Sequence, residues 1–205
     1  MKKMTNRKGT LIVLSGPSGT GKGTVLKHFF DNYADDAVKL SISATTRLPR
    51  NGETDGVNYF FVEKEKFENM VQNDMLLEWA SFCENCYGTP KAFVDENLEN
   101  GCDVILEIEV QGALKVMEKR PDAAFVFIAP PSMQELKNRI VGRQTETADV
   151  IEKRMETAKW EVQNISKYTY AVVNDDADMA AKRLKTIIDA ERLKVEKNNF
   201  ANLNG

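Results

Sequence analysis

Residues 16–24 read GPSGTGKGT and directly follow the apolar run LIVL at residues 11–14. The glycines permit backbone dihedrals that bulkier residues resist, so consecutive amide N–H groups can surround anionic oxygens, and Lys22 adds a mobile positive charge. Apolar residues at helical spacing then predict a helix whose N-terminus points at the same anion. The order of strand, glycine-rich loop and helix predicts a phosphate-binding loop, built from Gly16, Pro17, Ser18, Gly19, Thr20, Gly21, Lys22, Gly23 and Thr24.

One position of this loop departs from the usual pattern. Gly23 stands where a Ser or Thr hydroxyl normally serves magnesium, and the hydroxyl comes one residue later, at Thr24. We therefore expect Mg²⁺ to be held mainly through phosphates and water, without a dedicated set of protein ligands. The alternative interpretation of the loop is a flexible glycine turn, which the flanking strand and helix disfavour.

The composition is that of a globular protein. The 205 residues, 42% of them hydrophobic, are enough for one domain with inserted subdomains. A formal net charge of −3 argues against nucleic acid or an anionic membrane as the main partner. No stretch is apolar enough to cross a membrane, and the basic start lacks the apolar segment of a secretory signal, so we expect a cytoplasmic protein.

Cysteine and histidine are too sparse for several kinds of site. Three cysteines favour a reducing compartment over a disulfide framework. Cys83 and Cys86 form a CxxC, but zinc needs four ligands and the only histidine, His28, lies in the helix after the phosphate loop. We therefore expect neither a zinc site nor a Ser or Cys catalytic triad.

The rest of the chain alternates between strand and helix patterns. Strands are expected at residues 40–43, 59–62, 76–82, 104–108, 123–128 and 170–173. Thr89 followed by Pro90 predicts one helix start, and Ser132 with Glu135 predicts a capping box at another. Long helices are expected over residues 149–166 and around Leu184, and a frayed tail over residues 198–205. This alternation predicts a mainly parallel, three-layer α/β domain with ligands at the carboxyl ends of its strands.

Eight further segments, taken in order, resemble those of bacterial guanylate kinases over residues 9–188: SISATTRLPR, DGVNYFF, LLEWA, CYGTP, LEIEVQGA, FIAPPS, RIVGRQTE and VVNDD. The resemblance implies transfer of the γ-phosphoryl group of ATP to GMP, giving ADP and GDP, in purine metabolism and GMP recycling. It also implies a P-loop core at residues 9–40, 98–133 and 157–197, a GMP-binding domain at 41–97 and a lid at 134–156. GMP and ATP are then the partners, and the chain is a monomer or homodimer.

Phosphoryl transfer to an acceptor phosphate needs positive charge more than a base, because the acceptor is already largely ionised near neutral pH. Arg47 and Arg50, with Tyr59 and Tyr87, match the family positions that hold the GMP phosphate. Two forked guanidiniums and two phenol donors suit such a dianion. The local pattern alone also fits a solvated basic loop with core tyrosines.

Three more arginines match the lid positions that cover the triphosphate. Arg139 and Arg143 share one helical face, and Arg154 begins a similar face in the next helix. The spacing alone fits a solvated helix face equally well. Asn174, in VVNDD at the end of a strand, resembles the position near the adenine, and it also fits a turn residue.

Guanine presents N–H donors on one edge, so a residue that reads this edge should be an acceptor. Glu78, in LLEWA, matches the acid that binds guanine in the family, with hydroxyls from Ser43 and Thr89 beside it. An outward acid on a half-exposed strand is the alternative. Glu107 and Glu109 alternate along one expected strand and resemble a pair of acids at the metal and guanine side, although the family more often has Asp at the second position.

Other functional classes remain open at this point. A regulatory GTPase is disfavoured, because the sequence contains neither a DxxG segment after the loop nor an Asn-Lys-x-Asp motif. A non-catalytic interaction module related to guanylate kinase is a second alternative, against which the retained Lys22, loop glycines and arginines count. A kinase for another small phosphate is the third.

Overall fold

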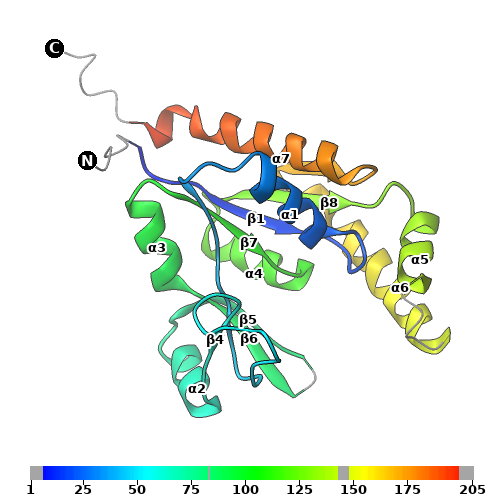
Figure 1. The fold of residues 1–205 in the computed structure, drawn as a ribbon, viewed down its shortest axis with the longest axis horizontal. Helices are drawn as coiled ribbons and strands as arrows, with labels where there is room; N and C mark the ends of the chain where they lie inside the picture. The colour runs from blue at the N-terminus through cyan, green and yellow to red at the C-terminus, as the bar shows by residue number, and fades with distance from the viewer. Residues whose placement is uncertain (1–6, 83, 143–147, 199–205) are drawn as a thin grey trace.

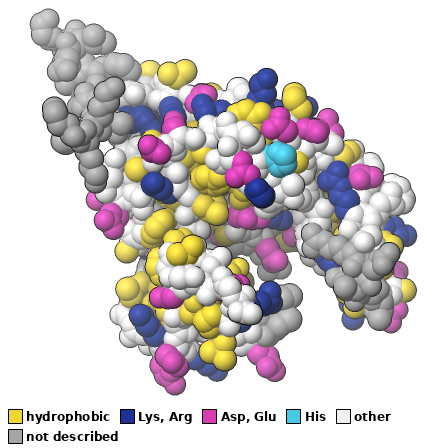
Figure 2. Space-filling view, in the orientation of Figure 1, with side chains coloured by type: hydrophobic (Ala, Val, Ile, Leu, Met, Phe, Trp, Pro, Cys, Tyr) yellow, Lys and Arg dark blue, Asp and Glu magenta, His cyan; other side chains and the backbone are white. Residues whose placement is uncertain are grey.

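The computed structural model describes residues 7–82, 84–142 and 148–198. It has two sheets, one above the other in Figure 1, with a third, helical part to one side. The larger sheet has the strand order β2-β7-β1-β8-β9, and the smaller one has the order β4-β3-β6-β5. In the space-filling view the molecule is hollowed between the upper body and the lower part (Figure 2).

All pairings in the five-stranded sheet are parallel, as the strand–helix alternation predicts. Its strands are β1 (Leu11–Ser15), β2 (Val38–Leu40), β7 (Asp103–Glu107), β8 (Ala124–Ala129) and β9 (Tyr170–Val173). The central strand β1 is apolar and buried along its whole length, because helices cover both faces of the sheet. Its last residue is followed by the phosphate loop, so this loop lies at the carboxyl edge of the sheet.

Successive residues of β1 enter two different cores. Ile12 and Leu14 pack with α1 (Lys22–Asn32) and α7 (Ala177–Arg192), whereas Leu11 and Val13 pack with α3 (Lys91–Glu99) and α4 (Val110–Lys119). Each fully buried aliphatic side chain contributes about 1.5–3 kcal/mol relative to an exposed one. The two cores therefore hold the sheet rigidly between its helices and fix the position of the loop after β1.

The smaller sheet combines parallel and antiparallel pairs. It contains β3 (Ala44–Thr45), β4 (Phe60–Phe61), β5 (Leu76–Phe82) and β6 (Asn85–Pro90), and α2 (Lys64–Gln72) packs on it. Ala44, Phe67 and Leu76 form its own buried cluster. The helix α4 of the larger unit packs against β5, which joins the two sheets.

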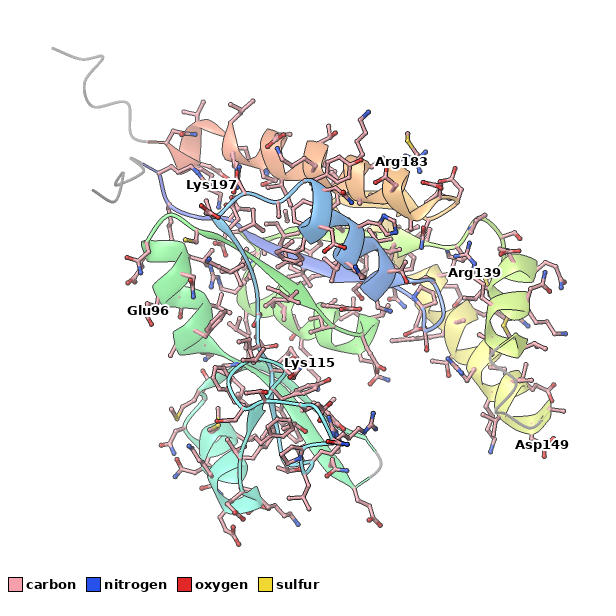
Figure 3. All side chains as sticks on the ribbon, viewed as in Figure 1. Glu96, Lys115, Arg139, Asp149, Arg183 and Lys197 are labelled. Atoms are coloured by element: carbon pink, nitrogen blue, oxygen red, sulfur yellow. The ribbon has the colours of Figure 1, made fainter. Side chains whose placement is uncertain are left out.

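The helical part at the side consists of α5 (Met133–Val141) and α6 (Ala148–Gln163). Leu136, Ile140 and Ala158 form a separate small core between them. The Ser132 hydroxyl accepts a hydrogen bond of 3.0 Å from the Glu135 backbone N–H, as the capping pattern predicts. Figure 3 shows Arg139 on α5, and it shows Asp149 at the outer end of α6. Two short 3₁₀ turns complete the fold, η1 (Ile165–Lys167) and η2 (Val195–Lys197).

Three local predictions are wrong in detail. Of the strand expected at residues 40–43, only Leu40 lies in a strand, the last residue of β2, and residues 41–43 connect β2 to β3 in the other sheet. The segment expected to begin a helix at Thr89 is instead strand β6, and α3 begins at Lys91 without a side-chain cap. β6 pairs with β5 and β3, and such long-range pairing overrides the local Thr-Pro signal. The helix expected over 149–166 ends at Gln163 and is followed by η1. Residues 199–205 of the expected tail lie outside the described residues.

Candidate active site

The phosphate loop connects β1 to α1 in a conformation that requires glycine at its first position. Gly16 has a φ of 149°, and a Cβ built there would lie 2.3 Å from the carbonyl oxygen of Ile128. No side chain fits at that distance. Within the loop, Gly16, Pro17 and Thr20 are buried. Its remaining residues line a pocket, and these are Ser18, Gly19, Gly21, Lys22, Gly23 and Thr24.

Lys22 lies folded over the loop that contains it. Its Nζ donates hydrogen bonds to the carbonyl oxygens of Gly16, at 2.6 Å, and Pro17, at 3.2 Å. Burial lowers the pKa of Lys22, whereas the negative charges of nearby glutamates raise it. The glutamates are Glu107, Glu161 and Glu109. An ammonium among carboxylates and backbone carbonyls can exchange these partners for the oxygens of a bound phosphate.

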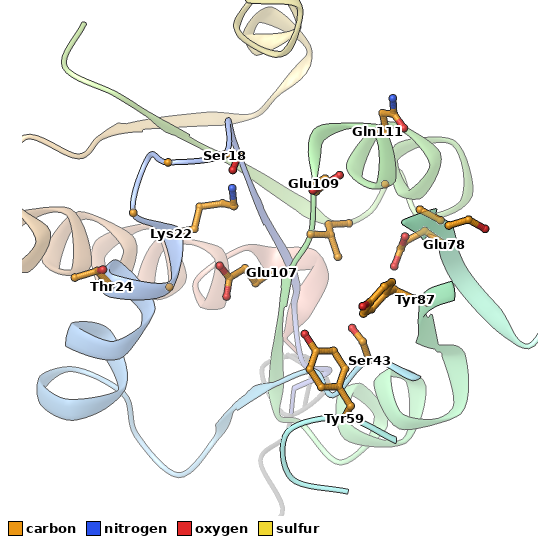
Figure 4. Close-up of a pocket in the computed structure, with 18 residues that line it drawn as sticks. Ser18, Lys22, Thr24, Ser43, Tyr59, Glu78, Tyr87, Glu107, Glu109 and Gln111 are labelled. Atoms are coloured by element: carbon orange, nitrogen blue, oxygen red, sulfur yellow. The ribbon is translucent and has the colours of Figure 1, made fainter. Parts of the chain in front are cut away.

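The pocket has a volume of about 950 Å³ and lies between the two sheets. Figure 4 shows Lys22, Thr24 and Glu107 on one side of it and Ser43, Tyr59, Glu78 and Tyr87 on the other. One wall therefore carries a cationic phosphate loop, and the opposite wall carries an acid, a serine and two phenols. A pocket of this size and polarity can hold two phosphate-bearing ligands end to end.

The acid on the far wall is Glu78 of β5. Its side chain is buried, and its Oε1 accepts a hydrogen bond of 2.8 Å from the Thr89 hydroxyl on β6. Burial raises the pKa of Glu78, while Thr89 and the positive charge of Lys115 lower it and Glu109 raises it. Ser43 lines the same wall. The structure thus brings together the three residues predicted to face a guanine.

The residues predicted to hold the acceptor phosphate are only partly assembled. The Tyr59 and Tyr87 rings lie 6.1 Å apart, and the Arg47 guanidinium lies 5.4 Å from the centre of the Tyr59 ring. Arg47 is paired with Glu53, with 2.8 Å between Nη2 and Oε1. Arg50 is exposed, and its backbone N–H donates to the same carboxylate at 2.7 Å. Glu53 is thus the anion that the Arg47 guanidinium and the Arg50 backbone N–H bind.

Two of the three predicted lid arginines contact the phosphate loop or its support. Arg154 of α6 donates to the Ser18 hydroxyl at 2.7 Å. Arg139 of α5 donates to the carbonyl oxygens of Asn174, at 3.1 Å, and Thr20, at 3.4 Å. Arg143 lies outside the described residues. Asn174, at the end of β9, is buried and donates from Nδ2 to the Thr20 carbonyl at 2.6 Å, so it supports the back of the loop.

Glu107 and Glu109 both line the pocket, but they do not share a strand as expected. β7 ends at Glu107, and Glu109 is the N-cap residue of α4. The chain turns there because Val110 and Ala113 enter the core beneath α4. Burial raises the pKa of Glu107, and the charge of Lys22 acts in the opposite direction.

Sequence reasoning missed Glu161. This residue of α6 is buried, and burial raises its pKa to about 7, against the opposing effects of Lys22 and the Ser18 backbone N–H. Glu109 adds to the rise. Helical spacing could have indicated that Glu161 is buried, because it lies three residues after the buried Ala158, on the face of α6 that packs against the protein.

The donor set near the loop fits Mg²⁺ bound together with phosphates. Within residues 7–82, 84–142 and 148–198, no group of three or more His, Cys, Asp or Glu side chains is arranged to hold a metal ion. Thr24 and Glu107 nevertheless offer a hydroxyl and a carboxylate beside Lys22. Mg²⁺ commonly takes one or two protein oxygens and completes its shell with phosphates and water.

In the part of the chain described, no helix is long and apolar enough to span a membrane.

Comparisons with known proteins identify the family of the chain. A sequence model of the guanylate kinase family matches residues 8–191. The chain is 54% identical over 194 residues to a guanylate kinase of Bacillus anthracis, covering 95% of this chain and 94% of that one. It is 54% identical over 192 residues to one of Caldanaerobacter subterraneus, covering 94% and 92%. The crystal structure of guanylate kinase from Anaplasma phagocytophilum superposes with a TM-score of 0.73 at 32% identity, covering 95% and 92%. The chain therefore belongs to the guanylate kinase family.

Proposed function

We propose that this chain transfers the γ-phosphoryl group of ATP to GMP, giving ADP and GDP, in the pocket between its two sheets. One observation carries the proposal: Lys22 in its glycine-rich loop and the buried Glu78 lie on opposite walls of one pocket of about 950 Å³. The loop is suited to the phosphates of a nucleoside triphosphate. The acid is suited to a base with adjacent N–H donors, and guanine presents such a pair, one on the ring and one exocyclic.

The proposed division into parts follows the separate apolar clusters in outline, although Val94 packs with the main sheet and Ala158 packs with α5. The core comprises residues 9–40, 98–133 and 157–197, the GMP-binding domain residues 41–97, and the lid residues 134–156. The small sheet and the α5–α6 pair each have a cluster of their own, which supports this division. Units with separate cores can move relative to the main sheet when both nucleotides bind.

On the GMP side, Glu78 accepts the N–H groups of the guanine edge, with Ser43 and Thr89 beside it. Arg47, Arg50, Tyr59 and Tyr87 hold the GMP phosphate, and for this the phosphate replaces the Glu53 carboxylate as the partner of Arg47. Such an exchange requires little reorganisation, because Arg47 and both tyrosines already lie side by side.

On the ATP side, Lys22 and the loop N–H groups hold the phosphates, and Arg139, Arg143 and Arg154 neutralise charge on the transferred group. Asn174 lies toward the adenine. Phosphoryl transfer has a transition state with charge spread over its equatorial oxygens, so positioning and charge neutralisation supply most of the catalysis. An oxygen of the GMP phosphate forms the new bond to the γ-phosphorus, and the bridging oxygen leaves with ADP.

Mg²⁺ accompanies ATP in this proposal, and Thr24, Glu107 and Glu109 are the residues that would approach it, mostly through water. When bound, the ion neutralises charge on the phosphates and orients them.

The cysteines Cys86 and Cys102 are free, which suits a reducing compartment. We propose a cytoplasmic protein that is a monomer or a homodimer.

A coupled assay of ADP formation tests the activity against GMP, dGMP, IMP, AMP, CMP and UMP with ATP and Mg²⁺. Turnover with GMP well above that with AMP and the pyrimidine nucleotides is expected. A protein that binds GMP and ATP without forming ADP would be an interaction module, and preferred turnover of another monophosphate would make it a different kinase.

A further inference from the structure

The backbone of α4 approaches the carboxylate of Glu78 so closely that a side chain at Gly112 would press on it. A Cβ built on Gly112 would lie 3.0 Å from Oε2 and 3.4 Å from Cδ of Glu78. An added side chain would therefore force the carboxylate to shift by a few tenths of an ångström. Alanine is the better residue for the interior of a helix, so helix formation does not explain a glycine here.

One turn further along α4, a lysine approaches the same part of β5. The Nζ of Lys115 donates to the carbonyl oxygen of Trp79, the neighbour of Glu78, at 2.8 Å, and it lies 5.6 Å from the centre of the Trp79 ring. Figure 3 shows Lys115 where α4 meets the smaller sheet. Gly112 and Lys115 are three residues apart, on one face of the helix.

We propose that Gly112 and Lys115 are positioning residues for base recognition: Gly112 leaves space for the Glu78 carboxylate in the orientation that guanine requires, and Lys115, bound to the neighbouring Trp79 carbonyl oxygen, supplies positive charge on the same face of α4. The inference rests on the proposed role of Glu78. It extends the recognition of the base from the GMP-binding domain to the core, since α4 belongs to the unit that carries the phosphate loop.

The two carboxylate oxygens are constrained from two different elements. Thr89 on β6 holds Oε1 at 2.8 Å, and the open space at Gly112 on α4 receives Oε2. A carboxylate fixed in this way can accept both N–H groups of guanine, one on the ring and one exocyclic. If the carboxylate moved by a few tenths of an ångström, the two hydrogen bonds could no longer form together with good geometry, although a single one still could.

Charge is the second part of the positioning. Four groups face Glu78: the hydroxyl and the backbone N–H of Thr89, the ammonium of Lys115 and the carboxylate of Glu109. Burial raises the pKa of Glu78, and Lys115 is the positive side chain that acts against this rise. Loss of that charge should raise the pKa of Glu78 further, so that the carboxylate becomes protonated at a higher pH.

Gly112→Ala tests the steric part. Because IMP lacks the exocyclic amino group, the ratio of kcat/KM for GMP to that for IMP reports on the paired hydrogen bonds. We expect a loss of about tenfold in kcat/KM for GMP, a smaller loss for IMP, and an unchanged KM for ATP. Gly112→Val should extend the same trend. A GMP to IMP ratio equal to that of the wild type in both folded variants would overturn the steric part.

Lys115→Met tests the charge, and Lys119→Met is a matched control. Lys119 is also an exposed lysine of α4, and it donates to a β5 carbonyl, that of Leu76, at 3.3 Å. We expect the acidic limb of kcat/KM for GMP to move to higher pH in Lys115→Met and to stay in place in Lys119→Met. The GMP phosphate titrates in the same way with every variant, so it does not cause a difference between their pH profiles. Lys115→Arg keeps the positive charge and should restore the wild-type profile. Identical profiles in the two methionine variants would overturn the role of Lys115.

Glu78→Gln separates the failure of this inference from the failure of its premise. If Glu78→Gln leaves the GMP to IMP ratio unchanged, Glu78 does not read guanine, and both proposals fall. If Glu78→Gln collapses the ratio while Gly112→Ala, Gly112→Val and Lys115→Met leave base preference and pH profile unchanged, only the role of α4 is overturned.

Discussion

The ammonium of Lys22 donates a hydrogen bond of 2.6 Å to the carbonyl oxygen of Gly16, the first residue of the loop in which Lys22 itself lies. The only strongly basic group of the loop is thus held by backbone atoms on the wall of the pocket. It needs only to exchange a carbonyl for a phosphate oxygen when a nucleotide arrives. Preorganisation of this kind reduces the reorganisation that the transition state requires.

Replacement of Lys22 by Met should therefore abolish most turnover and leave the fold intact. We expect kcat to fall at least about a hundredfold, because charge stabilisation in the transition state is lost. Thr24→Ala should cost less, since phosphates and water supply most of the magnesium ligands in our proposal. Steady-state kinetics with a thermal melt would check both. A folded Lys22→Met protein with a kcat near that of the wild type, or equal losses in the two variants, would contradict the assignment.

Substitution of Glu78 by Gln should narrow the preference for GMP over AMP. The amide keeps the size of the side chain but presents a donor where the guanine edge also donates, whereas adenine offers a ring acceptor. Sites built on such hydrogen bonds discriminate by about 10⁴ or more, so AMP should be a very poor acceptor for the wild type. The measurements are kcat/KM with GMP and with AMP, and ATP affinity separately, which should hardly change. Unaltered GMP preference would move base recognition away from Glu78.

Glu161 should make the protein less stable as the pH rises from about 4.5 to about 7. Its pKa is about 7 in the folded state, against 4.5 for the free group, so in this window the unfolded chain loses a proton that the folded chain retains. The full shift corresponds to roughly 3 kcal/mol, and solvent screening reduces this to about 2 kcal/mol.

Urea unfolding at several pH values measures this effect. Relative to the wild type, Glu161→Gln should gain about 2 kcal/mol between pH 4.5 and 7, because the amide carries no proton that ionises. Glu152→Gln is the matched control, since Glu152 is exposed on the same helix. Parallel stability curves for the wild type and Glu161→Gln would contradict the folded-state pKa.

Asp103 should be important for stability but not for nucleotide recognition. It is fully buried at the start of β7 and accepts hydrogen bonds from Arg7 at 2.8 and 2.9 Å, from the Thr10 N–H at 2.8 Å and from Arg192 at 2.6 Å. Asp103→Asn removes the carboxylate that pairs with Arg7 and with Arg192, which keeps its pair with Asp35, and should cost about 3 kcal/mol of unfolding free energy.

The ligand pocket lies at the other end of that strand, so the KM values for GMP and ATP should not change at a temperature where Asp103→Asn is folded. Asp95→Asn serves as the control, because Asp95 forms an exposed pair with Arg120 and should change stability by less than about 1 kcal/mol. If Asp103→Asn lowered the melting temperature no more than the control variant does, the importance of the Asp103 hydrogen bonds for stability would be refuted.

Local sequence determined the phosphate loop and the class of the fold. The glycine spacing, the apolar strand before it and the helical periodicity after it act within some twenty residues, and short-range sterics and hydrogen bonding suffice to impose them. The dense apolar strands likewise require helices on both faces, which is why the parallel three-layer architecture is confirmed.

Tertiary structure decided the contacts on which the proposed specificity depends. Thr89 has the local pattern of a helix cap, but pairing of β6 with β5 places its hydroxyl on Glu78. Glu161 meets the loop across more than a hundred residues of sequence, and Gly112 meets Glu78 only because α4 packs on β5. Such contacts arise from the burial of apolar surface between distant elements, and propensities read over a short window carry no information about which polar groups this burial brings together.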